Sequence, residues 1–69
     1  MVEVFKTNVR GIRKAKLIIE KLAEEFPKHK MNFDLSDRDR ILRVQGENIL
    51  ETKIIGIVTA LDCKCEILE

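Results

Sequence analysis

The sequence lacks the features that direct a chain to or across a membrane. The segment Met1–Thr7 has neither the basic beginning nor the apolar stretch of roughly 7 to 15 residues that make up a secretion signal. No apolar run approaches the ~18 residues of a membrane-spanning helix. These two absences predict a soluble domain in the cytoplasm, with no membrane as a partner.

Cysteine is scarce, because only Cys63 and Cys65 are present. On a strand, residues two positions apart have Cα atoms about 6.5 to 7 Å apart, at or beyond the limit for an unstrained disulfide. Two free thiols fit a reducing compartment. Alternation with Ile67 places both sulfurs on the core-facing side, which favours packing. Binding of copper(I) or zinc by this pair of thiols is the alternative.

Aromatic residues are also few, and neither sign of charge dominates. Thirteen basic and twelve acidic residues leave a net charge of +1, so the chain as a whole is not attracted to nucleic acid. The sequence holds three Phe and no Trp or Tyr. An RNA-binding domain of the RRM kind needs aromatic residues on its first and third strands, and the segment Arg40–Gln45 has none. Nucleic acid is therefore not expected as a partner, and any basic site must be local.

Hydrophobic periodicity predicts six elements in the order βαββαβ within a single domain, residues 1–69. Apolar residues alternate in four expected strands and recur every three or four positions in two expected helices. The strands are Val2–Thr7, Lys30–Leu35, Arg40–Gln45 and Cys63–Leu68, and the helices are Ile12–Phe26 and Leu50–Leu61. Pro27 ends the first helix. Asn48, followed three residues later by Glu51, is expected to cap the second.

This order of elements predicts an α+β fold of the ferredoxin-like type. Two right-handed crossovers place both helices on one face of a four-stranded antiparallel sheet. If Val4, Leu42 and Val44 face the helices, Phe5 and Ile41 lie on the open face, where an apolar patch would suit a homodimer. The register of the first strand stays open, because both Val4 and Phe5 are candidates for the core.

Residues at the start of the first helix follow a spacing known from one family. Asn8, Gly11 and Lys14 precede Ile18 and Leu22 at intervals of three and four. This resembles the heavy-metal-associated domain of copper chaperones and metal-pumping ATPases, which reads Gly-Met-x-Cys-x-x-Cys before two aliphatic positions. Asn8 stands at the family's Gly, while Gly11 and Lys14 replace its two Cys ligands. The resemblance implies a copper-chaperone-like domain that has lost its metal site, and we expect no metal at this loop.

Charges along the first helix run against the helix dipole. Basic residues crowd its start and acidic residues its end: Arg10, Arg13, Lys14 and Lys16, then Glu20, Glu24 and Glu25. Each misplaced charge costs about 0.3 to 1 kcal/mol, and local rules broken without compensation tend to mark function. Arg10, Arg13 and Lys14, on a loop shaped by Asn8 and Gly11, therefore predict a site for an anion or an acidic protein surface. The alternative is solvated charges softened by pairs such as Lys16 with Glu20.

The remaining polar residues do not suggest catalysis. No nucleophile, base and orienting group converge, so neither an enzyme nor a cofactor is expected. His29 is the only histidine and follows Pro27 in a polar connection, where an exposed side chain is expected. The preferred function is a small non-catalytic binding or docking module. The alternative is ligand sensing in the manner of ACT domains, which often place a Gly where the first strand enters the first helix, as Gly11 does here.

Overall fold

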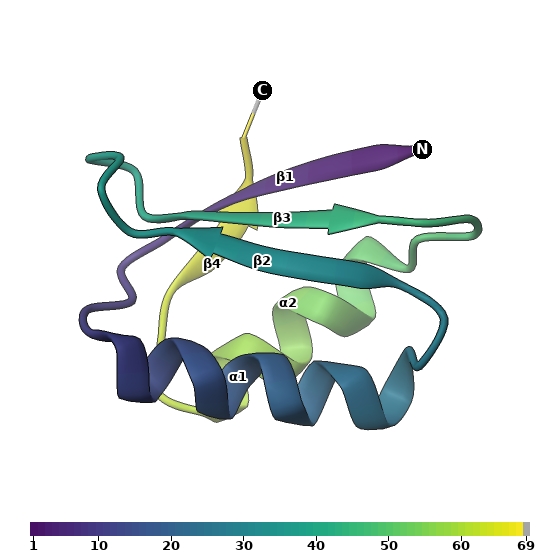
Figure 1. Ribbon diagram of the computed structural model, residues 1–69, viewed down its shortest axis with the longest axis horizontal. Helices are drawn as coiled ribbons and strands as arrows, with labels where there is room; N and C mark the ends of the chain where they lie inside the picture. Colours follow the sequence, from purple (N-terminus) through teal and green to yellow (C-terminus); the bar gives the residue numbers. More distant parts are fainter. Residues whose placement is uncertain (69) are drawn as a thin grey trace.

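Six elements follow one another in the order βαββαβ in the computed structural model of the chain, which describes residues 1–68 (Figure 1). They are β1 (Val2–Thr7), α1 (Ile12–Glu25), β2 (Lys30–Asp34), β3 (Ile41–Gln45), α2 (Glu51–Ala60) and β4 (Cys65–Ile67). The strands form one sheet in the order β2-β3-β1-β4, and every neighbouring pair is antiparallel. Both helices lie on the same face of this sheet (Figure 1). The predicted ferredoxin-like α+β fold is confirmed.

The ends of the first helix lie where the sequence places them. α1 begins at Ile12 and ends at Glu25, two residues before Pro27, and the backbone N–H of Phe26 donates to the carbonyl of Leu22 at 2.8 Å. β3 starts at Ile41, one residue later than predicted, because Arg40 has a φ of 47°, which no strand accommodates.

The start of the second helix and of the last strand differ from the prediction. α2 begins at Glu51 with Leu50 at its N-cap and no side-chain capping bond, so the expected cap at Asn48 is wrong. Asn48 has a φ of 55°, whereas an N-cap residue needs an extended backbone. β4 begins at Cys65 rather than Cys63, because the chain leaves α2 through a turn in which Asp62 has a φ of 65°.

β1 presents Phe5, not Val4, to the helices. Phe5 lies opposite Leu42 on one side and Ile67 on the other, and it is fully buried. The arrangement with Phe5 on the open face is therefore wrong, because burying the larger aromatic side chain removes more apolar surface from water than burying a valine. Ile41 does lie on the open face, by alternation with Leu42, but it is only 5% exposed.

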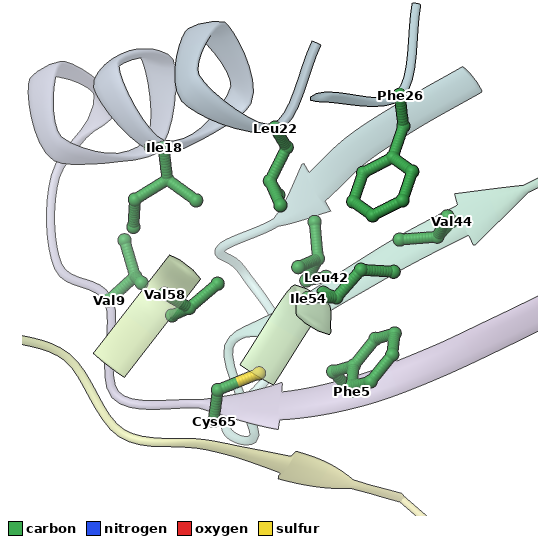
Figure 2. Packing of buried hydrophobic residues seen from close by; sticks show 11 residues of the cluster. Phe5, Val9, Ile18, Leu22, Phe26, Leu42, Val44, Ile54, Val58 and Cys65 are labelled. Carbon is green, nitrogen blue, oxygen red and sulfur yellow. The ribbon is translucent and has the colours of Figure 1, made fainter. Parts of the chain in front are cut away.

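The core lies between the sheet and the two helices (Figure 2). Side chains one helical turn apart, Ile18 and Leu22 on α1 and Ile54 and Val58 on α2, are all fully buried there. Full burial of such a side chain contributes roughly 1.5 to 3 kcal/mol, so these four residues attach both helices to the sheet. Within residues 1–68, no helix is long and apolar enough to cross a membrane.

The backbone conformation of Gly11 is one in which any other residue should lower the stability of the domain. Its φ of 83° and ψ of 149° fall in a region that L residues rarely adopt, although no atom lies within 4 Å of where a Cβ would be. We expect Gly11→Ala to lower the free energy of unfolding by about 1 to 3 kcal/mol in urea titrations. The control is Gly56→Ala within α2, where the Cβ position is equally open and a gain of about 0.5 to 1 kcal/mol is expected. Equal stability of Gly11→Ala and the wild type would contradict this account.

Candidate functional site

The connection from β1 to α1 and the first residues of the helix, residues 8–14, are anchored to the sheet; we call this segment the β1–α1 turn. Thr7, at the end of β1, is only 6% exposed, and its hydroxyl donates to the carbonyl of Arg40. The same hydroxyl accepts from the backbone N–H of Val9 at 3.2 Å, and Val9 is 1% exposed. The backbone N–H of Thr7 donates to the carbonyl of Asp39 at 3.0 Å. The turn is therefore anchored to the β2–β3 connection by both backbone and side-chain bonds.

Asn8 connects the turn to the other end of the chain. Its side-chain oxygen accepts a hydrogen bond of 2.7 Å from the backbone N–H of Lys64, in the connection before β4. Gly11 then provides the backbone conformation with which the chain enters α1, and its carbonyl accepts the first helical hydrogen bond, from Ala15 at 3.3 Å. Asn8 and Gly11, which the sequence predicted to shape the loop, thus fix its backbone.

The anchored turn carries three basic side chains. Arg10 and Arg13 are exposed and Lys14 is half-buried, and in the part of the chain that the structure describes none of them lies within 4.0 Å of a carboxylate. The softening pair of Lys16 with Glu20 does not form either, since the ion pairs among residues 1–68 are Lys6–Asp39 and Lys53–Glu25. The first turn of α1 holds no acidic residue and its last turn no basic one. The cations at the start of α1 therefore have no ion-pair partner in the described part of the chain, whereas Glu25 at the end of the helix pairs with Lys53 at 3.5 Å.

Two exposed apolar side chains lie beside these cations. Ile12 is 68% exposed and Leu17 is 39% exposed. With Gly11 and the three cations they line a shallow hollow of about 710 Å³. The surface at the start of α1 thus combines positive charge with apolar area, which suits a partner that is both acidic and apolar.

The two cysteines are free and pack against the core, as predicted, but they do not share a strand. Cys65 lies in β4 and is 9% exposed. Cys63 precedes the strand, is half-buried, and its sulfur lies 3.7 Å from the carbonyl of Leu61. Burial raises the pKa of the Cys65 thiol to about 11, with smaller contributions from Cys63 and Glu66. At neutral pH this thiol therefore keeps its proton, whereas metal binding requires the thiolate.

His29 is not the exposed side chain that was predicted. Its ring packs edge-on against Phe26, with centroids 5.3 Å apart. Both ring nitrogens are buried and have no hydrogen-bond partner within residues 1–68. The ring also fills the space that a side chain at position 46 would occupy, since a Cβ on Gly46 would lie 2.7 Å from its Cδ2 atom. Gly46, directly after β3, leaves the room for this close approach.

The open face of the sheet offers less apolar surface than the sequence suggested. Phe5 is absent from it, Ile41 is buried, and Val4 is half-buried. Lys6 and Arg43 are exposed on the same face, where they interrupt the apolar area. A homodimer through this face stays a prediction.

No protein-family model, no curated protein and no solved structure matches this chain. In the described part of the chain, residues 1–68, no three His, Cys, Asp or Glu side chains are grouped so that they could hold a metal ion.

The buried Cys65 thiol should make stability depend on alkaline pH. Its pKa in the folded state, about 11, exceeds the ordinary value of 9.0, so the native state keeps a proton that the unfolded state loses. The free energy of unfolding should therefore fall as pH rises from about 9 to 11, by about 2 kcal/mol from this group. We expect the fall to be smaller by that amount in Cys65→Ala, measured by urea unfolding. Parallel pH profiles for the variant and the wild type would contradict this.

We also expect no tight binding of copper(I) or zinc at the β1–α1 turn. Gly11 offers no side-chain ligand, and Lys14 is a basic side chain rather than a thiolate, imidazole or carboxylate. In competition with a chelator of about picomolar strength the protein should stay free of metal. The contrary result is stoichiometric retention of copper(I) that is lost in Cys63→Ser, which would assign metal binding to Cys63 and Cys65.

Proposed function

We propose that this domain is a small non-catalytic docking module that binds an acidic protein surface through the β1–α1 turn. Arg10, Arg13 and Lys14 are the contacts, and Asn8 and Gly11 hold the loop that presents them. The proposal includes the resemblance to a heavy-metal-associated domain without its metal ligands, in which the same loop serves protein contact instead of metal. The observation that carries it is the absence of any carboxylate within 4.0 Å of these three cations among residues 1–68.

The energetics of α1 support a role for these charges outside the fold. Arg13 and Lys14 lie in the first turn of the helix, where cations oppose the dipole at a cost of about 0.3 to 1 kcal/mol each. An acidic partner would remove this cost on binding. Its carboxylates would also attract the three cations directly, and salt at physiological concentration screens this attraction only in part. These charges therefore lower the free energy of unfolding of the free domain, and an acidic partner that neutralises them would recover that energy on binding.

The rigidity of the turn supports the same conclusion. Hydrogen bonds from Thr7 to Arg40 and from Lys64 to Asn8 fix the backbone before any partner arrives. Less conformational entropy is lost when a preformed loop binds than when a mobile one does. The exposed Ile12 and Leu17 favour a protein over a small anion, because a free anion has no apolar surface to place on them. This favours a protein partner over a small inorganic anion, and ACT-like sensing of a small organic ligand stays the alternative.

Charge reversal at the turn tests the proposal. We expect Arg13→Glu with Lys14→Glu to weaken binding of a fluorescent peptide of alternating glutamate and leucine at least about tenfold, measured by anisotropy. The matched control is Lys21→Glu with Lys28→Glu, which reverses two exposed charges away from the turn and should change binding little. Equal effects of the two double variants would mean that net charge, not the turn, attracts the peptide, and would overturn the proposal.

A second measurement separates loss of contact from loss of fold. Acidic residues in the first turn of α1 favour the dipole, so the same Arg13→Glu and Lys14→Glu variant should be more stable than the wild type by about 1 kcal/mol in urea unfolding. A variant that is more stable and no longer binds supports docking. Binding of inorganic phosphate in place of the peptide, seen by NMR shifts confined to the turn, would favour the small-ligand alternative.

A further inference from the structure

β2 is an edge strand that lacks two of the usual devices against pairing, although both of its end residues are charged. It lies at one end of the sheet, and all five of its residues pair with β3 in an unbroken antiparallel register. Since antiparallel ladders alternate, either Lys30, Asn32 and Asp34 or Met31 and Phe33 direct their backbone N–H and C=O groups outward. The strand contains no proline and no bulge, the devices that commonly block an edge. The opposite edge, β4, is only three residues long.

The sequence of β2 is complementary to itself in antiparallel pairing. In Lys-Met-Asn-Phe-Asp, a two-fold axis at Asn32 places Lys30 opposite Asp34 of a second copy, and Asp34 opposite its Lys30. Met31 then lies opposite Phe33 on the helix side of the sheet, and the two Asn32 residues meet on the open side. The hydrogen bond from the Ser36 hydroxyl lowers the pKa of Asp34, so its carboxylate is charged at neutral pH. Opposite charges directly across such a ladder stabilise it.

An apolar groove runs beside this edge. It has a volume of about 520 Å³ and lies between α1 and β2, lined by Ile12, Ala15, Ile19, Met31, Phe33 and Leu35. Met31, Phe33 and Leu35 line the groove from the side of β2, and they are only half-buried although they pack against the core. Lys16 and Glu20, of opposite sign, also line the groove. Pairing of two β2 strands would bring two such grooves together beneath one continuous sheet, where each would cover the other.

We propose that β2 is the interface through which two copies of this chain form a homodimer, with β2 paired antiparallel to β2 of the second copy. The occupant of the edge and groove is a second copy rather than another protein, because the charge pattern of the strand is complementary to its own reverse. The interface leaves the three cations of the docking surface free, since Arg10, Arg13 and Lys14 do not line the groove, and the two surfaces meet at Ile12, which lines both.

Charge variants provide a test that depends on this register. Sedimentation velocity over a hundredfold range of concentration should show a reversible monomer–dimer equilibrium for the wild type. Lys30→Glu makes the strand wholly acidic and Asp34→Lys makes it wholly basic, so each should raise the dimer dissociation constant at least about tenfold. An equimolar mixture of the two variants should dimerise again, because each strand then meets the opposite charge. The matched control Lys21→Glu, on the outer side of α1, should dimerise as the wild type does.

Asp34 accepts hydrogen bonds from the backbone N–H and the hydroxyl of Ser36, so Asp34→Lys removes bonds of the turn after β2 as well as a charge. Hydrogen exchange on the wild type tests the interface without this substitution. In the wild type, protection of the outward amides among residues 31–34 should increase with protein concentration, while that of β4 should not change. A wild type that stays monomeric throughout would overturn the proposal. A dimer that neither charge variant weakens would also overturn it, and would place the contact elsewhere, such as on the open sheet face.

Discussion

The register of β1 determines where nearly every other part of this domain lies. Phe5 is fully buried between Leu42 of β3 and Ile67 of β4, so it holds both neighbours of the central strand in place. Because side chains alternate along a strand, turning Phe5 inward also turns Thr7 inward. A shift by one residue would expose the aromatic ring and bury Lys6, which has no partner on the core side. The identity of one residue thus selects the face for the whole strand.

The inward position of Thr7 in turn builds the surface at the start of α1. A buried hydroxyl needs hydrogen-bond partners, and Thr7 finds them in the carbonyl of Arg40 and the N–H of Val9. The β1–α1 turn is therefore rigid for reasons of core packing, whatever its charges do. Arg10, Arg13 and Lys14 are carried on a support that does not depend on them, and this is the arrangement in which surface charges are free to serve recognition.

Periodicity alone predicted the fold because each element buries one face. Ile18 and Leu22 mark the inner side of α1 in the sequence as clearly as they do in the structure. The register of β1 was not predictable by the same rule, since Val2 and Val4 alternate as well as Phe5 and Thr7 do. Asn48 misled because asparagine is common both at N-caps and at positive φ. The burial of His29 depends on the missing side chain of Gly46, a contact between distant residues that no local pattern contains. The charged turn was visible in the sequence, but the lack of partners for its cations was not.

The position of β1 at the centre of the sheet also has a consequence for how the chain is made. Its partners are β3, which begins at residue 41, and β4, which begins at residue 65. β1 therefore lacks one of its two pairing strands until β4 has been synthesised. Until then Phe5 has no complete site, and the hydrogen bond from Lys64 to Asn8, across 56 positions, cannot form. Contacts this far apart in sequence are slow to close. During translation the nascent domain therefore presents an incomplete sheet until residue 67 has left the ribosome, and its folding is completed only after that point.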